Sequence, residues 1–218
     1  MNRPRVRGTV LRAQTGRPTQ SATVRVVPVV PVVPVPDLTE DEKSGCALVY
    51  AAFVDALTGP PRSFNGKDYL DVTALRVHRL ARTSPSHRAF MGEIKTCDAA
   101  VYYLARAGAR MRLAPCIAMA LIQALAAGND RNRVKLGVVS ADIVRLMKVW
   151  SGDTHFLWYG CGAMSILAQV GVNKRMLVDA GAREVLQELL RRPDALLEHT
   201  SGGNMRDRTT RLLTYLNV

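Results

Sequence analysis

Helical periodicity runs through most of the chain. From position 37 onward, hydrophobic residues recur three and four positions apart, and short breaks rich in Gly, Ser, Asn and Pro separate the runs. This spacing is typical of amphipathic α-helices, and we find no turn-bounded alternation of the kind that predicts strands. The sequence therefore predicts an all-α domain over residues 37–218. Its helices are expected at 39–57, 67–82, 94–107, 111–127, 129–137, 139–150, 154–169, 172–180, 182–191 and 205–217.

Start and stop signals support the first of these helices. Thr39 stands three positions before Glu42, which is the spacing of a capping box. Gly59-Pro60-Pro61 is expected to end the same helix, because glycine and proline both disfavour its continuation. The triplet at 84–86, Ser-Pro-Ser, is interpreted as a break between two later helices.

The first 36 residues have a different composition. They contain no acidic residue, and segment 26–36 places a proline at every second or third position. Proline blocks both helices and central strands, so this segment should be extended polyproline-II chain. We therefore predict a disordered basic tail over residues 1–36 and a separate helical domain over 37–218. The arginines of the tail are Arg3, Arg5, Arg7, Arg12, Arg17 and Arg25.

Two other interpretations of the tail stay open. An arginine-rich, acid-free segment is also typical of a mitochondrial transit peptide, although Pro4, Gly8, Gly16 and Pro18 oppose the helix that such a peptide needs. A ligand for a proline-binding domain is the second alternative, but repeated Val-Pro only loosely matches the usual motif.

Composition narrows the class of partner. The formal net charge is +12, so we expect an acidic partner: a nucleic acid, an acidic protein or an anionic surface. The alternative is that the charge only keeps the protein in solution. The four cysteines form no Cys-x-x-Cys pair and lie in apolar helical patterns, which predicts buried thiols and a reducing, cytoplasmic location. No apolar run has the length of a membrane span, and no signal peptide is recognised.

The helical pattern repeats. Shifting the chain by 42 residues places Leu125 on Leu167 and Arg133 on Arg175, with many further apolar matches. Residues 158–168 (WYGCGAMSILA) and 173–190 (NKRMLVDAGAREVLQELL) resemble an armadillo repeat, in which a long third helix is followed by Asn, a short helix, Ala-Gly-Ala and a second helix. The resemblance implies a right-handed α-solenoid of about three such repeats with capping helices.

The resemblance also implies where a partner would bind. Third helices of armadillo repeats line a concave groove, and nuclear-import adaptors use a Trp and an Asn from each. That ladder is absent here and the chain is basic, so this branch of the family is excluded. We expect instead an apolar groove for a partner helix, or small residues that only allow close packing. The equivalent positions are Leu75, Arg79, Ala120, Ala124, Gly162, Ile166, Arg211 and Tyr215.

A basic edge is the second candidate surface. Basic residues recur near the start of the short first helix of each repeat, where stacking would align them along one side. Such a row would suit phosphates or acidic side chains, and the alternative is ordinary solvated turn residues. The residues of this basic edge are Arg88, Arg131, Arg133, Lys174 and Arg175.

Catalysis finds no support in the sequence. The four histidines lie far apart, no metal-binding or phosphate-binding motif occurs, and Cys161 between two glycines falls in a helical run. We therefore predict a non-enzymatic scaffold or adaptor with no cofactor and no metal, which binds a protein partner through its groove and basic edge. The alternative is a nucleic-acid-associated structural protein that uses the basic tail.

Overall fold

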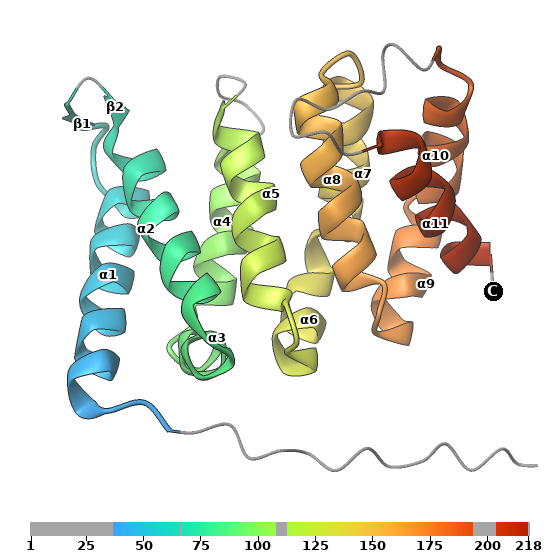
Figure 1. Cartoon of the computed structure of the whole chain (residues 1–218). Coiled ribbons are helices and arrows are strands. Elements are labelled where there is room, and N and C mark those ends of the chain that lie inside the picture. Colours follow the sequence, from blue (N-terminus) through green and yellow to red (C-terminus); the bar gives the residue numbers. More distant parts are fainter. Residues whose placement is uncertain (1–36, 66, 108–112, 194–203, 218) are drawn as a thin grey trace, which may run out of the picture. The chain divides into compact units, whose positions relative to one another are not determined.

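The computed structural model describes residues 37–65, 67–107, 113–193 and 204–217. The predicted tail at 1–36 lies outside these ranges. Helices dominate the described part, which confirms the all-α class (Figure 1). The helices are α1 (Glu40–Thr58), α2 (Tyr69–Thr83), α3 (Pro85–Glu93), α4 (Thr96–Ala107), α5 (Leu113–Ala126), α6 (Asp130–Leu136), a 3-10 turn at Gly137–Val139, α7 (Ser140–Val149), α8 (Thr154–Leu167), α9 (Gly171–Asp179), α10 (Ala182–Leu190) and α11 (Met205–Asn217).

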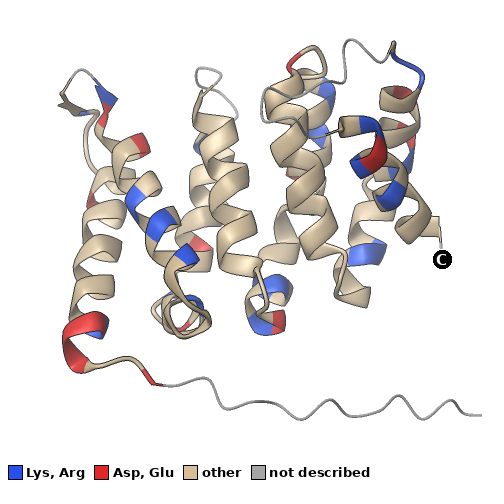
Figure 2. Cartoon of the chain, in the orientation of Figure 1, with Lys and Arg blue, Asp and Glu red and all other residues tan. Residues whose placement is uncertain are grey.

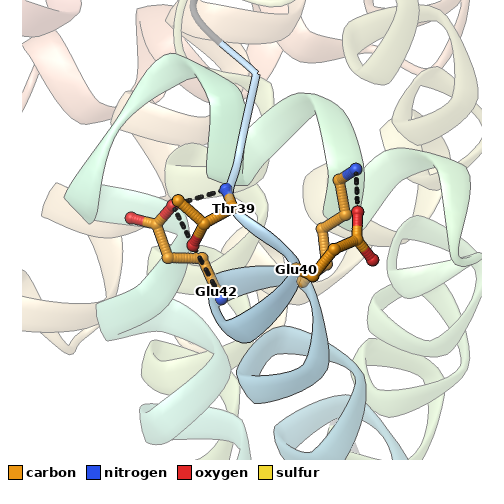
Figure 3. A network of polar contacts seen from close by, with 4 residues as sticks. Thr39, Glu40 and Glu42 are labelled. Atoms are coloured by element: carbon orange, nitrogen blue, oxygen red, sulfur yellow. Dashed lines mark hydrogen bonds and ion pairs between the residues drawn. The ribbon is translucent and has the colours of Figure 1, made fainter.

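The predicted capping box begins α1 (Figure 3). The Thr39 amide donates to Glu42 Oε2 at 2.8 Å, and the Glu42 amide donates to Thr39 Oγ1 at 3.3 Å. The Thr39 hydroxyl also donates to Glu42 Oε2, at 3.0 Å, and the two bonds donated by the Thr39 amide and hydroxyl lower the pKa of the Glu42 carboxyl, because they stabilise its charged form. At the other end, the Gly59 amide donates to Asp55 O at 2.8 Å, so α1 ends where the sequence predicts.

The helix α3 was not predicted, and Ser84-Pro85 is the reason. The pair begins α3 as well as separating it from α2. Ser84 Oγ accepts a hydrogen bond from the His87 amide at 3.2 Å, and Pro85 occupies the first turn. A proline there sacrifices no helical hydrogen bond, since the first amides of a helix have no partner within it. The interpretation of 84–86 as a break was therefore incomplete.

A short hairpin corrects the expectation that no strand occurs. Strands β1 (Ser63–Phe64) and β2 (Lys67–Asp68) pair antiparallel, with Ser63 opposite Asp68. Asn65 has a φ of 51°, and it precedes a glycine in the sequence. Asn-Gly is the strongest sequence signal for a two-residue hairpin turn, because both residues tolerate positive φ.

The longer helices form one continuous core. Helix α5 packs against α2 and α4 on one side and against α8 on the other, and α11 packs against α8 and α10. Figure 1 shows α2, α5, α8 and α11 following one another across the molecule. Most of α5 is buried and none of its residues is charged, because neighbouring helices cover it from both sides. Its many alanines, together with Leu, Ile and Met side chains, suit such close helix packing.

Buried asparagines join successive elements of this core. In α6, Asn132 Nδ2 donates to Arg88 O at 2.8 Å and to Leu125 O at 3.0 Å. It therefore ties the end of α5 to α3, and it gives a donor to the Leu125 carbonyl, which lies in the last turn of α5. A glycine makes room for the amide, since a Cβ on Gly92 would lie 1.9 Å from Asn132 Oδ1.

The same arrangement recurs one unit later. In α9, Asn173 Nδ2 donates to Arg133 O at 2.7 Å and to Leu167 O at 3.2 Å. Here Gly137 corresponds to Gly92, because a Cβ on Gly137 would lie 1.9 Å from Asn173 Oδ1. The two asparagines are 41 positions apart, so they lie one residue out of the 42-residue shift found in the sequence.

Candidate binding surface

The predicted groove positions fall on α2, α5, α8 and α11, but they differ in exposure. Leu75, Arg79, Arg211 and Tyr215 are exposed, whereas Ala120 and Ile166 are half-buried. Ala124 and Gly162 are buried. The exposed positions therefore belong to the two outer long helices, and the small residues belong to the two inner ones.

Gly162 lies inside a helix contact instead of on an open surface. The side chain of Gln123 reaches from α5 across to α8, where its Nε2 donates to Tyr159 O at 2.9 Å. A Cβ on Gly162 would lie only 2.4 Å from Gln123 Oε1. Of the three small residues expected to floor an apolar groove, Ala124 and Gly162 are buried and Ala120 is half-buried, and the missing Cβ of Gly162 makes room for Gln123.

An open cleft of about 550 Å³ lies between α8 and α11. It includes Arg211 and Tyr215 from the predicted groove, together with residues outside that groove. Trp158 stands on its α8 side and Arg208 on its α11 side. The remaining lining residues are Ser165, Gln169, Asn204, Asp207 and Leu212.

One wall of the cleft is a stack of Arg208 on Trp158. The guanidinium carbon lies 3.8 Å from the centroid of the indole ring, and Arg208 Nη1 donates to Trp158 O at 2.9 Å. Partial burial lowers the pKa of Arg208, although it stays far above neutral pH and the side chain keeps its charge. The stack therefore offers a fixed positive charge beside a flat apolar surface.

The opposite side of the cleft links the groove to the basic edge. Lys174 Nζ of α9 lies 4.9 Å from the centroid of the Tyr215 ring. Tyr215 is 45% exposed and Arg211, one turn earlier on α11, is exposed as well. Two residues that the sequence assigned to different surfaces, Lys174 and Tyr215, thus meet at one place.

The rest of the basic edge divides into structural and accessible residues. Arg88 Nη1 donates to Ala81 O at 3.1 Å, near the end of α2, and Arg133 forms an ion pair with Asp130. Burial lowers the pKa of Arg88. Arg131 and Arg175, in contrast, are exposed. The structure therefore does not present the five residues as one uniform row.

Many further arginines donate to carbonyl groups near helix ends. Arg183 Nη2 donates to Leu216 O at 2.6 Å, and Arg206 Nη1 donates to Leu190 O at 2.9 Å. Arg106 and Arg192 act in the same way on Leu57 O and on Ser151 O. Cations are favourable there because the carbonyl end of a helix carries partial negative charge. Part of the large positive charge is accordingly used to hold the fold together.

Among α2, α5, α8 and α11, the basic residues lie on the two outer helices, α2 and α11. Arg76, Arg79 and Arg82 of α2 are exposed, and burial together with Arg82 and Arg79 lowers the pKa of the neighbouring His78. Figure 2 shows α2 and α11 with basic segments, while α5 and α8 carry none. The row of long helices is therefore basic at its two ends and uncharged between them.

The cysteines have no geometry for nucleophilic chemistry. Cys46, Cys97, Cys116 and Cys161 are buried, as the sequence predicted. Burial raises the pKa of Cys97 to about 12 and that of Cys161 to about 11, so both stay protonated at neutral pH. Across the described ranges, no three His, Cys, Asp or Glu side chains lie close enough together to hold a metal ion.

Comparisons with known proteins assign no family to this chain. No protein-family model matches the chain, and no curated protein matches it. In the part of the chain that the structure describes, every helix is too short or too polar to cross a bilayer. The arginines of the predicted tail, from Arg3 to Arg25, lie outside the described residues.

Proposed function

We propose that residues 37–218 form a right-handed, armadillo-like α-solenoid that binds a protein partner and catalyses no reaction. The recurrence of a short helix, a second helix and a long helix supports three such units: α3 to α5, α6 to α8 and α9 to α11. The equivalent asparagines Asn132 and Asn173 support the same division. Helices α1 and α2 then cap the beginning of the solenoid.

The observation that carries the proposed function is the cleft between α8 and α11. It is open, it combines aromatic rings with arginine side chains, and Asp207 is the one acidic residue among the described residues that line it. Aromatic and arginine side chains dominate the energetics of protein interfaces, because they bury much area and still form directed polar contacts. Because Trp158 and Arg208 already hold each other in place, binding a partner there costs these two side chains little conformational freedom.

The partner that fits this cleft is an acidic peptide segment with an apolar side chain. Arg211 and Lys174 supply charge for its carboxylates, and the Tyr215 ring supplies an apolar surface. The exposed arginines of α2 extend the basic character to the other end of the row, so a longer acidic partner would be attracted along it. We place this scaffold or adaptor function in the cytoplasm, because a reducing compartment keeps four cysteines as thiols.

A peptide selection tests the proposal. The full chain is used to select from a display library of mixed acidic and apolar peptides, and affinities are then measured for the wild type and for Arg211→Glu. The matched control is Arg145→Glu, which reverses an exposed charge on α7, away from the cleft. The proposal requires selected peptides that lose about tenfold in affinity with Arg211→Glu and stay unchanged with Arg145→Glu.

The net charge of +12 favours a second candidate, association with nucleic acid through the basic tail. Binding of mixed-sequence RNA and DNA is measured across a salt series, with the full chain and with residues 1–36 removed. Tight binding whose logarithm falls linearly with that of the salt concentration, and which disappears with the tail, would favour this candidate. Weak binding that does not depend on the tail would leave the peptide-binding function.

A further inference from the structure

The middle of the outward face of α1 is uncharged, and no described residue covers it. The eleven residues at 44–54 contain no charged side chain, although α1 is the first helix of the domain. The helix packs against α2, α3 and α4 through Phe53, Leu57 and their neighbours. On the other side Leu48 is 72% exposed, and Ala47 and Ala51 are exposed too. The terminal element of a helical repeat protein usually has a polar outer face, and the middle of this one is apolar.

The exposed residues of this face are spaced like a helix-pairing seam. Positions 41, 44, 48, 51, 55 and 58 follow one another at alternating intervals of three and four, and all six are exposed. That interval keeps one stripe of a helix facing a partner helix along its length. At its centre the stripe has Leu48 and Ala51, and polar residues occupy its ends. A surface that pairs with another helix has this order of apolar centre and polar rim.

The first turn of α1 and the hairpin beyond its other end differ in charge. Glu40, Asp41 and Glu42 occupy the first turn. Beyond the last residue, Arg62 forms an ion pair with Asp55 of α1, and Lys67 of the hairpin is exposed. Figure 2 shows the acidic segment at the beginning of α1 and a basic segment in the hairpin beyond its other end. A surface with this polarity is complementary to itself when one copy is turned end to end.

We propose that α1 is a homodimer interface, in which two copies of the chain pair their α1 helices antiparallel about a two-fold axis. Centred between positions 48 and 51, the pairing places Leu48 of each copy opposite Ala51 of the other. The small side chains at 47 and 51 let the helices approach closely, and the acidic first turn of each copy meets Lys67 of the other. The helix dipoles also oppose one another favourably.

The expected dimer is weak, because the contact is short. A helix of 19 residues is about 28 Å long. One helix pair with a hairpin at each end gives an interface at the small end of specific protein contacts, so we expect a micromolar dissociation constant. The dimer is independent of the cleft between α8 and α11, and either proposal survives failure of the other.

Sedimentation velocity of the full chain tests the interface. Concentrations from about 1 to 200 μM should move the wild type from monomer to dimer. Leu48→Glu places a charge at the centre of the pairing and should keep the protein monomeric throughout. The matched control is Leu113→Glu, which changes a leucine of 60% exposure at the start of α5 and should dimerise like the wild type. A wild type that stays monomeric at 200 μM overturns the proposal.

Charge reversal and cross-linking test the antiparallel register. Lys67→Glu should weaken the dimer about tenfold, and adding Asp41→Lys should restore it, since the two reversed charges meet again. With Leu48→Cys, a short bismaleimide should link two full chains, because the native cysteines are buried. Val138→Cys, at a position of 60% exposure in the 3-10 turn, is the control that should stay unlinked. Equal cross-linking of both variants, or no rescue by Asp41→Lys, contradicts the antiparallel pairing.

Discussion

The side-chain oxygen of Asn173 occupies the space that a Cβ on Gly137 would need, at 1.9 Å from its ideal position. The Asn173 amide nitrogen at the same time satisfies two backbone carbonyl groups, those of Arg133 and Leu167. Gly137 therefore leaves the space that the Asn173 side chain fills, and Asn173 in turn joins the ends of α6 and α8 by hydrogen bonds to their carbonyl groups.

This relationship predicts a strong, conditional effect of Gly137→Ala. The added methyl group should displace the Asn173 amide and lower the free energy of unfolding by about 2 kcal/mol or more. Asn173→Ala alone should have a similar effect, because it leaves two buried carbonyls without a donor. Chemical denaturation measures both. In the Asn173→Ala background, Gly137→Ala should add much less, which is the sign of direct coupling.

The control for this cycle is Gly152→Ala, since no atom lies within 4 Å of its ideal Cβ position. It should change stability by less than about 0.5 kcal/mol. Additive effects of Gly137→Ala and Asn173→Ala would show that the two residues do not depend on each other, and would remove one support for the repeat division.

The buried pair of Tyr103 and Asp71 predicts a pH-dependent effect. The Tyr103 hydroxyl donates to Asp71 Oδ1 at 2.7 Å, while burial raises the pKa of the Asp71 carboxyl and this hydrogen bond lowers it. Because the pKa of Asp71 is higher in the folded state than in the unfolded state, Asp71 destabilises the folded state increasingly as the pH rises above the unfolded-state pKa. Tyr103→Phe removes the hydrogen bond, so its loss of stability should be about 1–3 kcal/mol at neutral pH and smaller at about pH 4.

Denaturation curves at several pH values measure this dependence. In the Asp71→Asn background, the loss of stability caused by Tyr103→Phe should no longer depend on pH, because no carboxylate is left to be desolvated. A loss for Tyr103→Phe that is the same at pH 4 and pH 7.5 would assign the effect to packing alone.

The arginines of the basic edge should separate into two kinds. Arg88→Ala removes a half-buried guanidinium that donates to Ala81 O, and should lower thermal stability by several degrees. Arg131→Ala, at an exposed position of the same edge, should leave the melting temperature within about one degree. Differential scanning fluorimetry of the two variants decides between them. Equal melting temperatures would mean that Arg88 is as free for a partner as Arg131.

The thiols should report unfolding. Because Cys97 and Cys161 are buried and burial raises the pKa of each, an aromatic disulfide reagent should label them only when the protein opens. Labelling of the native protein should therefore be slow and should accelerate with denaturant. Rapid labelling without denaturant would show that the core around α4 and α8 opens locally.

Most helices could be predicted from the sequence, because their periodicity and end signals are local. The capping box of Thr39 and the glycine after α1 are examples. Helix α3 was missed because Ser-Pro signals both an end and a beginning, and only the side-chain hydrogen bond of Ser84 decides which. The hairpin had a recognisable signal in Asn65 and the glycine after it.

The candidate site was harder to predict, because its contacts join residues far apart in the chain. Arg211 and Tyr215 were found through helical spacing and the resemblance. The stack of Arg208 on Trp158 joins positions 50 residues apart, and the filling of the space at Gly162 depends on the reach of Gln123 from another helix. A periodicity argument gives the face on which a residue lies, but not the neighbouring side chain that covers it.

The most direct measurement of the central claim is a charge-exchange experiment at the cleft. The affinity of the Arg211→Glu variant is measured for an acidic peptide selected on the wild-type chain, and for the same peptide with its critical Glu changed to Lys. We predict that the variant binds the acidic peptide about tenfold more weakly than the wild type does. The exchanged peptide should recover most of that affinity, since opposite charges meet again. Unchanged affinity with Arg211→Glu, or no recovery with the exchanged peptide, would contradict binding between α8 and α11.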